Sequence, residues 1–536
     1  MTIPNVGLCN TCRARVPAEF FTRDGQTWIR KTCPACGATE SLVSSDAAAW
    51  QAKRDLWSYV PTDPQHCTLN CDCCQVDHKP NMVFLDVTNR CNMNCPICIA
   101  TIRGMGFDFN PPMAYFDKIF AALAKMDPQP VIQLFGGEPT VRSDLLEIIQ
   151  IARKHGLRPH VTTNGVRLAD EDYCRTLCEA NVQMRFAFDG PQPEIYERLR
   201  NNRAAGPKKL KALENLKKYS RRRQTIISCA AWGINDKYIG DLLQYCHDNR
   251  DLISDIGIIP LTENWDEGTF DAASHTTMED VEKMVQQAIE GVEFVPAGLS
   301  YVLKKPRSFF RRNPRSETLL LAGVHPNCES ITLLISDGHR YRSINHCLKK
   351  PFTQAVVEVA ALCRKIEGRL DRLDPRKFFQ RLRGQLLIVR TLGPWVLGAV
   401  RLGRVIAEGI ADLIRNRRAR RSGAASNLPQ RRPRRILRLA MLPFEEQHSV
   451  DAARMESCKA VFAYEDPDDG RVKTIPACLW YPYRNAILEK LSAKYGVVRG
   501  NSPADGAAMN ANVPAPQVQA AQVNPPLTTA TEVRPQ

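Results

Sequence analysis

Residues 87–98 read VTNRCNMNCPIC and place Cys91, Cys95 and Cys98 in a Cys-x3-Cys-x2-Cys pattern, directly after the apolar run Met82–Val87. Thiolates are the usual protein ligands of iron–sulfur clusters. Three cysteines at this spacing can bind three irons of a 4Fe–4S cluster and leave the fourth iron open to another ligand. The motif therefore predicts a cluster in the first strand-to-helix loop of an α/β domain.

Short apolar runs alternate with amphipathic stretches from this motif onward. Six runs are strand candidates: Met82–Val87, Val131–Phe135, Arg158–Thr163, Gln183–Phe188, Thr225–Ala230 and Asp255–Ile259. The segments between them have helical periodicity, as in Pro112–Met126, where four large apolar side chains share one face. Strands that alternate with helices form a parallel sheet with right-handed crossovers. Six such units predict a partial, open (β/α)6 barrel.

A second motif, Phe135-Gly-Gly-Glu-Pro139, ends the second strand candidate. With the cysteines it resembles the radical SAM superfamily, over roughly residues 80–260. The resemblance implies a TIM-like partial barrel, a 4Fe–4S cluster on Cys91, Cys95 and Cys98, and radical chemistry on an unactivated carbon through reductive cleavage of S-adenosylmethionine (SAM). It also implies which residues bind SAM: Gly136, Gly137, Glu138, Pro139, Thr163, Asn164 and Asp189. Ordinary strand-end turns remain the alternative for the last three.

Composition narrows the class of protein. The 536 residues are 44% hydrophobic and 24% charged, which excludes a fully disordered chain, a collagen and a multi-span membrane protein. Twenty cysteines and no visible secretory signal in Met1–Asn10 predict a cytoplasmic metal protein rather than a disulfide scaffold. The net charge of +16 favours an anionic partner.

Two Cys-x2-Cys pairs near the N-terminus predict a second metal site. Two such pairs can form a tetrahedral four-thiolate centre for zinc or a single iron, as in a rubredoxin-like knuckle. Its ligands are Cys9, Cys12, Cys33 and Cys36. Because four protein ligands close the site, we expect a structural or electron-transferring role.

Two further cysteine sets predict auxiliary clusters, which gives two to three 4Fe–4S clusters in total. Cys67, Cys71 and Cys74 repeat the Cys-x3-Cys-x2-Cys spacing; Cys73, a nearby histidine or no residue would supply the fourth ligand, and a zinc site is the alternative. The second set lies in the C-terminal half: Cys328, Cys347, Cys458 and Cys478. Its alternative is that these cysteines are buried packing residues.

Residues 375–440 are helical and strongly basic. An apolar band from Leu386 to Leu402 is interrupted by arginines, so a membrane-spanning helix is not expected. An amphipathic helix on an anionic membrane surface and a solvated, arginine-rich linker fit about equally well. The arginine tract has no interleaved aromatic residues, so we expect no nucleic-acid partner.

The order of the motifs is similar to that of the tetraether lipid synthase and pterin-type radical SAM methyltransferase group. The resemblance implies carbon–carbon bond formation on a hydrophobic, lipid substrate at the inner face of a membrane. Methylation of a pterin-like small molecule, peptide maturation and a membrane-docked iron–sulfur electron carrier are the alternatives. Electrons would come from a donor such as flavodoxin or ferredoxin.

The chain divides into seven predicted segments. They are a four-cysteine knuckle (1–60), an auxiliary cluster segment (61–80), the partial barrel (81–300), a C-terminal cysteine region (301–350), a basic helical segment (351–440), a cysteine segment that closes the auxiliary site (441–500) and a disordered tail (501–536).

Overall fold

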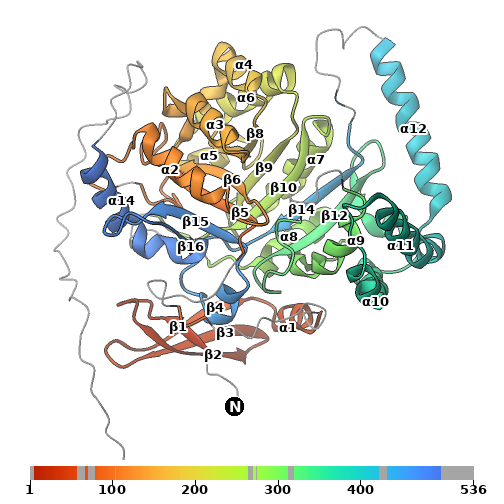
Figure 1. The fold of residues 1–536 in the computed structure, drawn as a ribbon, viewed down its shortest axis with the longest axis horizontal. Coiled ribbons are helices and arrows are strands. Elements are labelled where there is room, and N and C mark those ends of the chain that lie inside the picture. Colours follow the sequence, from red (N-terminus) through yellow and green to blue (C-terminus); the bar gives the residue numbers. More distant parts are fainter. Residues whose placement is uncertain are drawn as a thin grey trace, which may run out of the picture.

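The computed structural model describes residues 5–56, 67–69, 79–102, 104–263, 270–272, 274–311, 319–421, 431 and 433–496. Within these residues the strands form two sheets, a four-stranded sheet near the N-terminus and a twelve-stranded sheet. Figure 1 shows the small sheet below the large one, with a group of long helices at one side of the molecule.

The small sheet is an antiparallel meander. Its strands are β1 (Val6–Leu8), β2 (Arg15–Arg23), β3 (Gln26–Cys33) and β4 (Gly37–Ser44), in that order. Asp24 and Gly25 connect β2 to β3 with φ values of 52° and 73°, which suits a tight hairpin turn. Helix α1 (Ala47–Asp55) follows, capped by the side chain of Asp46, which accepts a hydrogen bond from the amide of Ala49.

Six parallel strands form the centre of the large sheet. They are β5 (Met82–Thr88), β6 (Val131–Gly136), β7 (Arg158–Thr163), β8 (Gln183–Ala187), β9 (Gln224–Ala230) and β10 (Ile253–Pro260). Each agrees with a predicted strand to within two residues at either end. The helices between them are α2 (Met113–Leu123), α3 (Leu145–Lys154), α4 (Glu171–Glu179), α5 (Pro193–Arg200), α6 (Ala205–Tyr219) and α7 (Ile239–Asp248). The predicted α/β partial barrel is therefore confirmed.

The C-terminal half extends this sheet at both edges. Strand β14 (Ile436–Met441) pairs in parallel with β10, and β15 (Ala460–Glu465) pairs in parallel with β5. Eight neighbouring strands are therefore parallel, in the order β15-β5-β6-β7-β8-β9-β10-β14. The remaining strands, β11 (Val295–Pro296), β12 (Ser330–Ser336), β13 (Tyr341–Ser343) and β16 (Val472–Pro476), are antiparallel to their neighbours.

Helix α14 (Ala477–Tyr495) fastens the C-terminal region to the barrel. Asp86 of β5 is buried and accepts hydrogen bonds from Trp480 Nε1 at 2.8 Å and from the Arg484 guanidinium at 2.7 Å. A buried carboxylate needs such partners, because an unpaired one costs several kcal/mol, on the order of the penalty for breaking a buried ion pair. Three further helices lie in the described residues: α8 (Met278–Ala288), α9 (Lys304–Ser308) and α13 (Ala452–Glu456).

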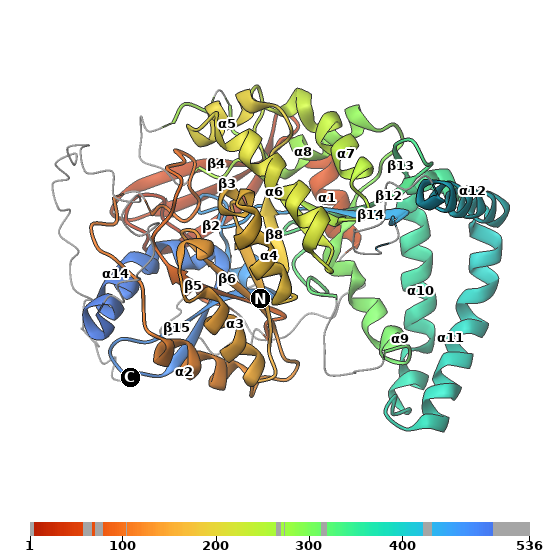
Figure 2. The same ribbon diagram turned by 90° about the horizontal axis from the view of Figure 1, so that it is seen from above.

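Three long helices, α10 (Phe352–Asp371), α11 (Phe378–Ala399) and α12 (Leu402–Arg421), form a helical arm. In Figure 2, α10 and α11 run side by side away from the barrel. The apolar band predicted from the sequence divides between two faces of α11: Ile388 is buried, whereas Leu386 and Val389 are 57% and 56% exposed. Among the described helices, none combines the length and the apolar character that crossing a bilayer requires.

Candidate active site and metal centres

The loop after β5 carries the first cysteine motif. Cys91, Cys95 and Cys98 are each partly buried, at the end of the sheet where the parallel strands finish. Backbone hydrogen bonds hold this loop to the next strand, since Gly137 N donates to Thr88 O at 2.7 Å and Glu138 N donates to Arg90 O at 2.8 Å. The Gly-Gly-Glu motif thus fixes the backbone of the cysteine loop.

Only glycine fits at the two central positions of that motif. A Cβ atom on Gly136 would lie 2.3 Å from Thr88 O, and one on Gly137 would lie 2.1 Å from Arg90 O. Gly136 also has a φ of 121°, which L side chains rarely adopt. The two glycines therefore permit the close contact between the two loops.

Glu138 joins the ends of β6 and β7. Its buried carboxylate accepts hydrogen bonds from Thr163 Oγ1 at 2.7 Å and from the amide of Asn164 at 2.6 Å, and also from the amide and hydroxyl of Thr140. Pro139 begins a short turn after it, η2 (Pro139–Val141). Three of the residues predicted to bind SAM, Glu138, Thr163 and Asn164, thus form one hydrogen-bonded unit.

Asn164 connects this unit to the cluster loop. The side-chain nitrogen Nδ2 of Asn164 lies 3.8 Å from Cys91 Sγ and donates a hydrogen bond to Asn92 Oδ1 at 2.8 Å. Met93 N also donates to Cys91 Sγ, at 3.4 Å. Donors to sulfur are typical of cysteines that bind iron–sulfur clusters and tune their potentials.

The thiols of Cys91 and Cys95 need a metal to lose their protons. Burial raises the pKa of Cys91 and of Cys95, and the neighbouring thiols raise it further. Metal binding deprotonates such thiols. Three cysteines on one loop, with two N–H donors at Cys91 Sγ, suit a cluster that keeps one iron open.

Asp189, also predicted to bind SAM, is held by protein groups. Its buried carboxylate accepts two hydrogen bonds of 3.0 Å from Arg200 and one of 2.8 Å from Cys229 N. Burial opposes ionisation, but the Arg200 guanidinium holds the pKa of this carboxyl below its usual value. Asp189 therefore orients Arg200 beside the cluster loop, where Arg200 counteracts the rise in the pKa of Cys95.

Two cations near the cluster were not identified from the sequence. Arg200 is the last residue of α5, and Lys209 lies in α6, where its Nζ donates to Asn164 O and Ala187 O at 2.6 Å each. Burial lowers the pKa of Lys209 to about 8. The run Lys208-Lys209 looks like an ordinary solvated helix face in the sequence, so nothing in it indicated that one lysine turns inward.

A cavity of about 200 Å³ lies inside the barrel, next to the cluster loop. Its walls are largely apolar: Met82, Phe84, Ile97, Ile99, Phe135, Ala187, Ile227, Ile259, Pro260, Leu261, Leu442 and Phe444. Its polar lining residues are Thr162, Arg185, Arg200, Ser228, Cys229 and Thr262. Cys229 is thus part of the cavity wall. The space suits a small or elongated apolar group held near the cluster.

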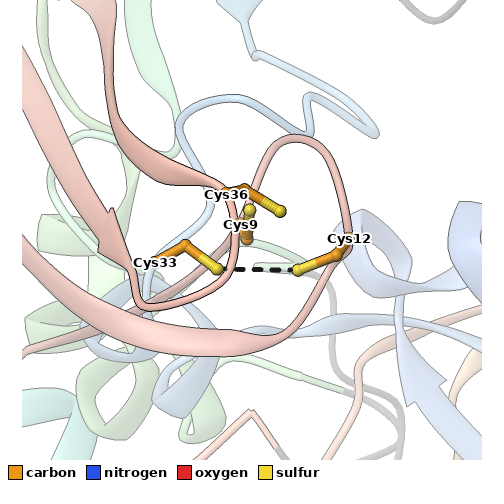
Figure 3. Close-up of side chains that lie close together, drawn as sticks. All are labelled: Cys9, Cys12, Cys33 and Cys36. Atoms are coloured by element: carbon orange, nitrogen blue, oxygen red, sulfur yellow. Dashed lines mark hydrogen bonds between the residues drawn. The ribbon is translucent and has the colours of Figure 1, made fainter.

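The four N-terminal cysteines converge as predicted. Figure 3 shows the four sulfur atoms facing one another. They all lie within 4.8 Å of one another, and Cys12 Sγ is 3.7 Å from Cys33 Sγ; the residues are Cys9, Cys12, Cys33 and Cys36. A tetrahedral site with Zn–S bonds of about 2.3 Å has S···S edges of about 3.8 Å. The four thiols therefore fit a zinc ion or a single iron without rearrangement.

The second Cys-x3-Cys-x2-Cys motif is described only at Cys67, since Cys71, Cys73 and Cys74 lie outside the described residues. Leu69 N donates to Cys67 Sγ at 3.4 Å, which repeats the contact between Met93 N and Cys91 Sγ. The amide of Cys67 donates to Glu456 Oε1 at 2.9 Å. This motif therefore begins beside the chain segment that carries Cys458.

Three of the four C-terminal cysteines are neighbours. Cys328 and Cys458 each raise the pKa of the buried Cys478 thiol, whereas Arg454 lowers it. The fourth, Cys347, is instead buried beside Glu408 and Arg435. Its carbonyl accepts a hydrogen bond of 2.9 Å from Arg401 N at the start of the third arm helix. The expected set of four thus reduces to three cysteines around Arg454, because the helical arm holds Cys347 elsewhere.

Comparisons with known proteins agree with this geometry. The radical SAM superfamily matches residues 85–246, and the HMPTM N-terminal zinc ribbon domain matches residues 6–45. The 7,8-dihydro-6-hydroxymethylpterin dimethyltransferase of Methanocaldococcus jannaschii is 28% identical over 517 residues, 91% of this chain and 95% of that protein.

Two other similarities are shorter. The Fe-coproporphyrin III synthase of Methanosarcina barkeri is 32% identical over 140 residues, 26% of this chain and 34% of that protein. The solved structure of native anSMEcpe with bound AdoMet and Cp18Cys peptide is 19% identical and covers 39% of this chain and 59% of that chain, with a TM-score of 0.32.

Proposed function

This chain is a radical SAM enzyme, and from that premise we propose that it methylates a small heterocycle of the pterin type. The observation that carries the proposal is the 28% identity to a pterin dimethyltransferase over 91% of this chain and 95% of that protein, a share far larger than the barrel alone. A match to the barrel alone would support the superfamily and no particular substrate.

The cofactors supply the radical chemistry, because a 4Fe–4S cluster cleaves bound SAM reductively to a 5′-deoxyadenosyl radical. The protein's contribution is positioning. Glu138 connects the ends of β6 and β7 by hydrogen bonds. Asn164 and Lys209 lie beside the cluster loop, and we propose that they orient SAM. The other residues proposed to orient SAM are Gly136, Gly137, Pro139 and Thr163. The apolar walls of the cavity exclude water from the reacting carbon.

A polar group in the cavity supports a heterocyclic substrate. Thr162 Oγ1 is buried in the cavity wall and has no hydrogen-bond partner among the described residues. A buried hydroxyl without a partner costs about 1–3 kcal/mol, which a substrate's nitrogen or oxygen would recover. Arg185 and Arg200 add two donors to the same cavity.

Anaerobic incubation of the reconstituted protein with SAM, dithionite and a reduced hydroxymethylpterin tests the proposal. We expect 5′-deoxyadenosine and a pterin in which one or two hydrogen atoms are replaced by methyl groups, with a second molecule of SAM as the donor of each methyl group, which leaves S-adenosylhomocysteine, and dithionite as the source of electrons. Cys95→Ala, which removes a cluster ligand, is the control and should form neither product. Production of 5′-deoxyadenosine without any methylated pterin would reject the substrate class and retain the radical chemistry.

A lipid tail is the second candidate substrate, with carbon–carbon bond formation as the reaction. The largely apolar cavity favours it, as does an apolar stripe on the outer face of α11, where Phe379, Leu382, Leu386, Val389 and Leu397 are exposed. Incubation with membrane-lipid extracts in place of the pterin distinguishes the two, because coupling of two hydrocarbon chains removes two hydrogen atoms from the product mass.

The same stripe supports docking on an anionic membrane surface from the cytoplasmic side. Helix α11 carries Arg381, Arg383 and Arg390 and no acidic residue, so charge and apolar contact act together on one helix. We expect the protein to sediment with phosphatidylglycerol vesicles and not with phosphatidylcholine vesicles. Leu386→Glu should abolish sedimentation, while Ile436→Glu, at an exposed site outside the arm, should not.

The remaining cysteines serve auxiliary metals in this proposal. Cys67, Cys71 and Cys74 would bind one 4Fe–4S cluster, and Cys328, Cys458 and Cys478 would bind another, both transferring electrons from flavodoxin or ferredoxin. The shared N–H···S contact of Cys67 and Cys91 supports the first, and the proximity of three thiols to Arg454 supports the second. Iron and sulfide analysis of Cys67→Ala and Cys478→Ala should each show the loss of one cluster.

A further inference from the structure

Two histidines and two glutamates meet at the mouth of the barrel cavity. Thr262 and Phe444 line the cavity just after β10 and β14, and Thr262 Oγ1 lies 3.2 Å from Phe444 O. Glu263 directly follows the first of these residues, and Glu446 lies two positions after the second. The cluster is therefore adjacent to the cavity and includes no cysteine, although Arg454, which the three C-terminal cysteines surround, also lies beside Glu446.

The side chains already converge on one point. His275, Glu446 and His448 each offer one ligand atom, and these atoms all lie within 4.8 Å of one another. The two imidazole rings are 4.5 Å apart between centroids and inclined at 82°. Glu263 Oε1 is 3.0 Å from His275 Nδ1, which brings a second carboxylate to the group.

One ring nitrogen has no role in the protein's own hydrogen bonds. His448 Nε2 is buried and has no hydrogen-bond partner among the described residues, and it lies 3.6 Å from Glu446 Oε1. The other oxygen of Glu446 accepts a hydrogen bond from Ser449 Oγ and lies 3.6 Å from an Arg454 nitrogen. Oε1 is thereby left facing His448.

We propose that His275, Glu446 and His448, with Glu263 as a further ligand, bind one divalent first-row transition metal ion, zinc or ferrous iron. Two imidazoles with one or two carboxylates are a common ligand set for these ions. Ser449 and Arg454 act as the outer partners that fix the orientation of a ligating carboxylate.

The four-stranded sheet holds the loop that carries Glu446 and His448 at two points. Lys31 of β3 donates to Gln447 O at 3.4 Å and to Asn10 Oδ1 at 3.1 Å, so the four-cysteine sheet contacts this loop directly. Gly7 and Asp451 also form an isolated β-bridge. Ligands held in this way lose little entropy when a metal binds.

The position of the site indicates what the ion would do. A metal with open coordination positions at the cavity mouth would hold an oxygen or nitrogen of the substrate's polar end, while the apolar part enters the barrel. This role, unlike the metal site itself, rests on the proposed function. The test therefore measures metal binding in the absence of substrate.

The experiment counts zinc in the full-length, anaerobically reconstituted holoprotein after removal of loosely bound metal and re-addition of Zn²⁺. The variants are His448→Asn and the near-isosteric Glu446→Gln. The matched control is His155→Asn, since His155 also faces a carboxylate, Asp117 at 2.8 Å, but has no second imidazole beside it. Iron content and circular dichroism confirm that each variant is folded.

We expect both site variants to bind one zinc ion per chain fewer than the wild type and His155→Asn. Equal zinc content in all four proteins would overturn the proposal. If His448→Asn does not fold, Glu446→Gln and a Mn²⁺ titration of the wild type followed by electron paramagnetic resonance decide instead. The titration does not register the four-thiolate site, which disfavours Mn²⁺, so the lack of a saturable Mn²⁺ site together with unchanged zinc in Glu446→Gln would also overturn it.

Discussion

Lys53→Met tests how the N-terminal four-cysteine region is fastened to the barrel. Lys53 lies in α1 and is 5% exposed, and its Nζ is 2.8 Å from Glu279 Oε1 and 2.6 Å from Glu282 Oε1, both in α8. Methionine keeps an unbranched side chain of similar length and removes only the charge. The substitution therefore leaves two buried carboxylates facing a neutral side chain.

The expected cost follows from the burial of all three groups. Breaking a buried ion pair by removing one partner costs about 3–5 kcal/mol. Burial already raises the pKa of Glu282, and Lys53 is the cation that opposes this rise. Without the lysine the pKa of Glu282 rises further and its carboxyl takes up a proton in the folded state, so the destabilisation should grow as the pH rises from about 5 to 8.

Hydrogen exchange of the α1 amides reports the loss of stability directly. It is measured by mass spectrometry at equal pH for variant and wild type. A cost of about 3–5 kcal/mol corresponds to exchange that is faster by roughly a hundredfold to a few thousandfold. Lys283→Met is the matched control, because Lys283 lies in the same helix α8 and pairs with Asp46 at 3.7 Å with 43% of its side chain exposed. Surface pairs of this kind contribute about 0–1 kcal/mol.

Two outcomes would refute the reasoning. The first is equal exchange in Lys53→Met and Lys283→Met. The second is a defect that is larger at pH 5 than at pH 8, because that sign requires a group other than the two carboxyls. Adding Glu279→Gln and Glu282→Gln to Lys53→Met should restore protection, since no buried charge is then left unpaired.

Three further perturbations have defined outcomes. Gly137→Ala places a Cβ 2.1 Å from Arg90 O and should reduce 5′-deoxyadenosine formation at least tenfold, about 1.4 kcal/mol, whereas Gly240→Ala, with its nearest contact at 3.7 Å, should not; equal activity would contradict the role of the close contact. Cys36→Ser should remove one metal ion per chain and leave the other clusters' iron unchanged; loss of cluster iron would show that the N-terminal site is not independent. Burial raises the pKa of Glu329 to about 8 from 4.5, and that of Glu445 to about 8 as well, so the wild type should lose thermal stability between about pH 5 and 8 and Glu329→Gln should lose less; parallel melting profiles would show that Glu329 does not contribute.

The barrel and its cluster loop could be predicted because their signals are local. Strand β5 is buried at every position and all of its residues except Asp86 and Thr88 are apolar, so it is recognisable in the sequence, and the cluster cysteines follow within a few residues. The Gly-Gly-Glu motif stands at the end of the next strand for the same reason. A parallel sheet brings such strand ends together, which is why sequence position predicted spatial proximity here.

The C-terminal half was less predictable because its contacts are distant in the chain. Strands β14 and β15 are each six residues long and pair with strands that begin 183 and 378 residues earlier, so no local pattern specifies their partners. Cys347 shows the same limit: its spacing from Cys328 resembles a ligand pair, but a contact with the helical arm decides its environment. Arg200 and Lys209 were missed because a buried cation looks like a solvated one in sequence.

The pairing of β14 with β10 gives the four-cysteine region an indirect connection to the cavity. The segment after β14 contributes Leu442 and Phe444 to the cavity wall and Glu446 and His448 to the proposed metal site, and Lys31 of β3 holds the carbonyl between those last two residues. Cys33 ends the same strand β3, two residues from Lys31. Loss of the N-terminal metal should therefore loosen the cavity mouth before it affects the cluster loop, which is held by backbone hydrogen bonds from Gly137 and Glu138. We therefore expect the Cys36→Ser protein still to cleave SAM but no longer to modify its substrate.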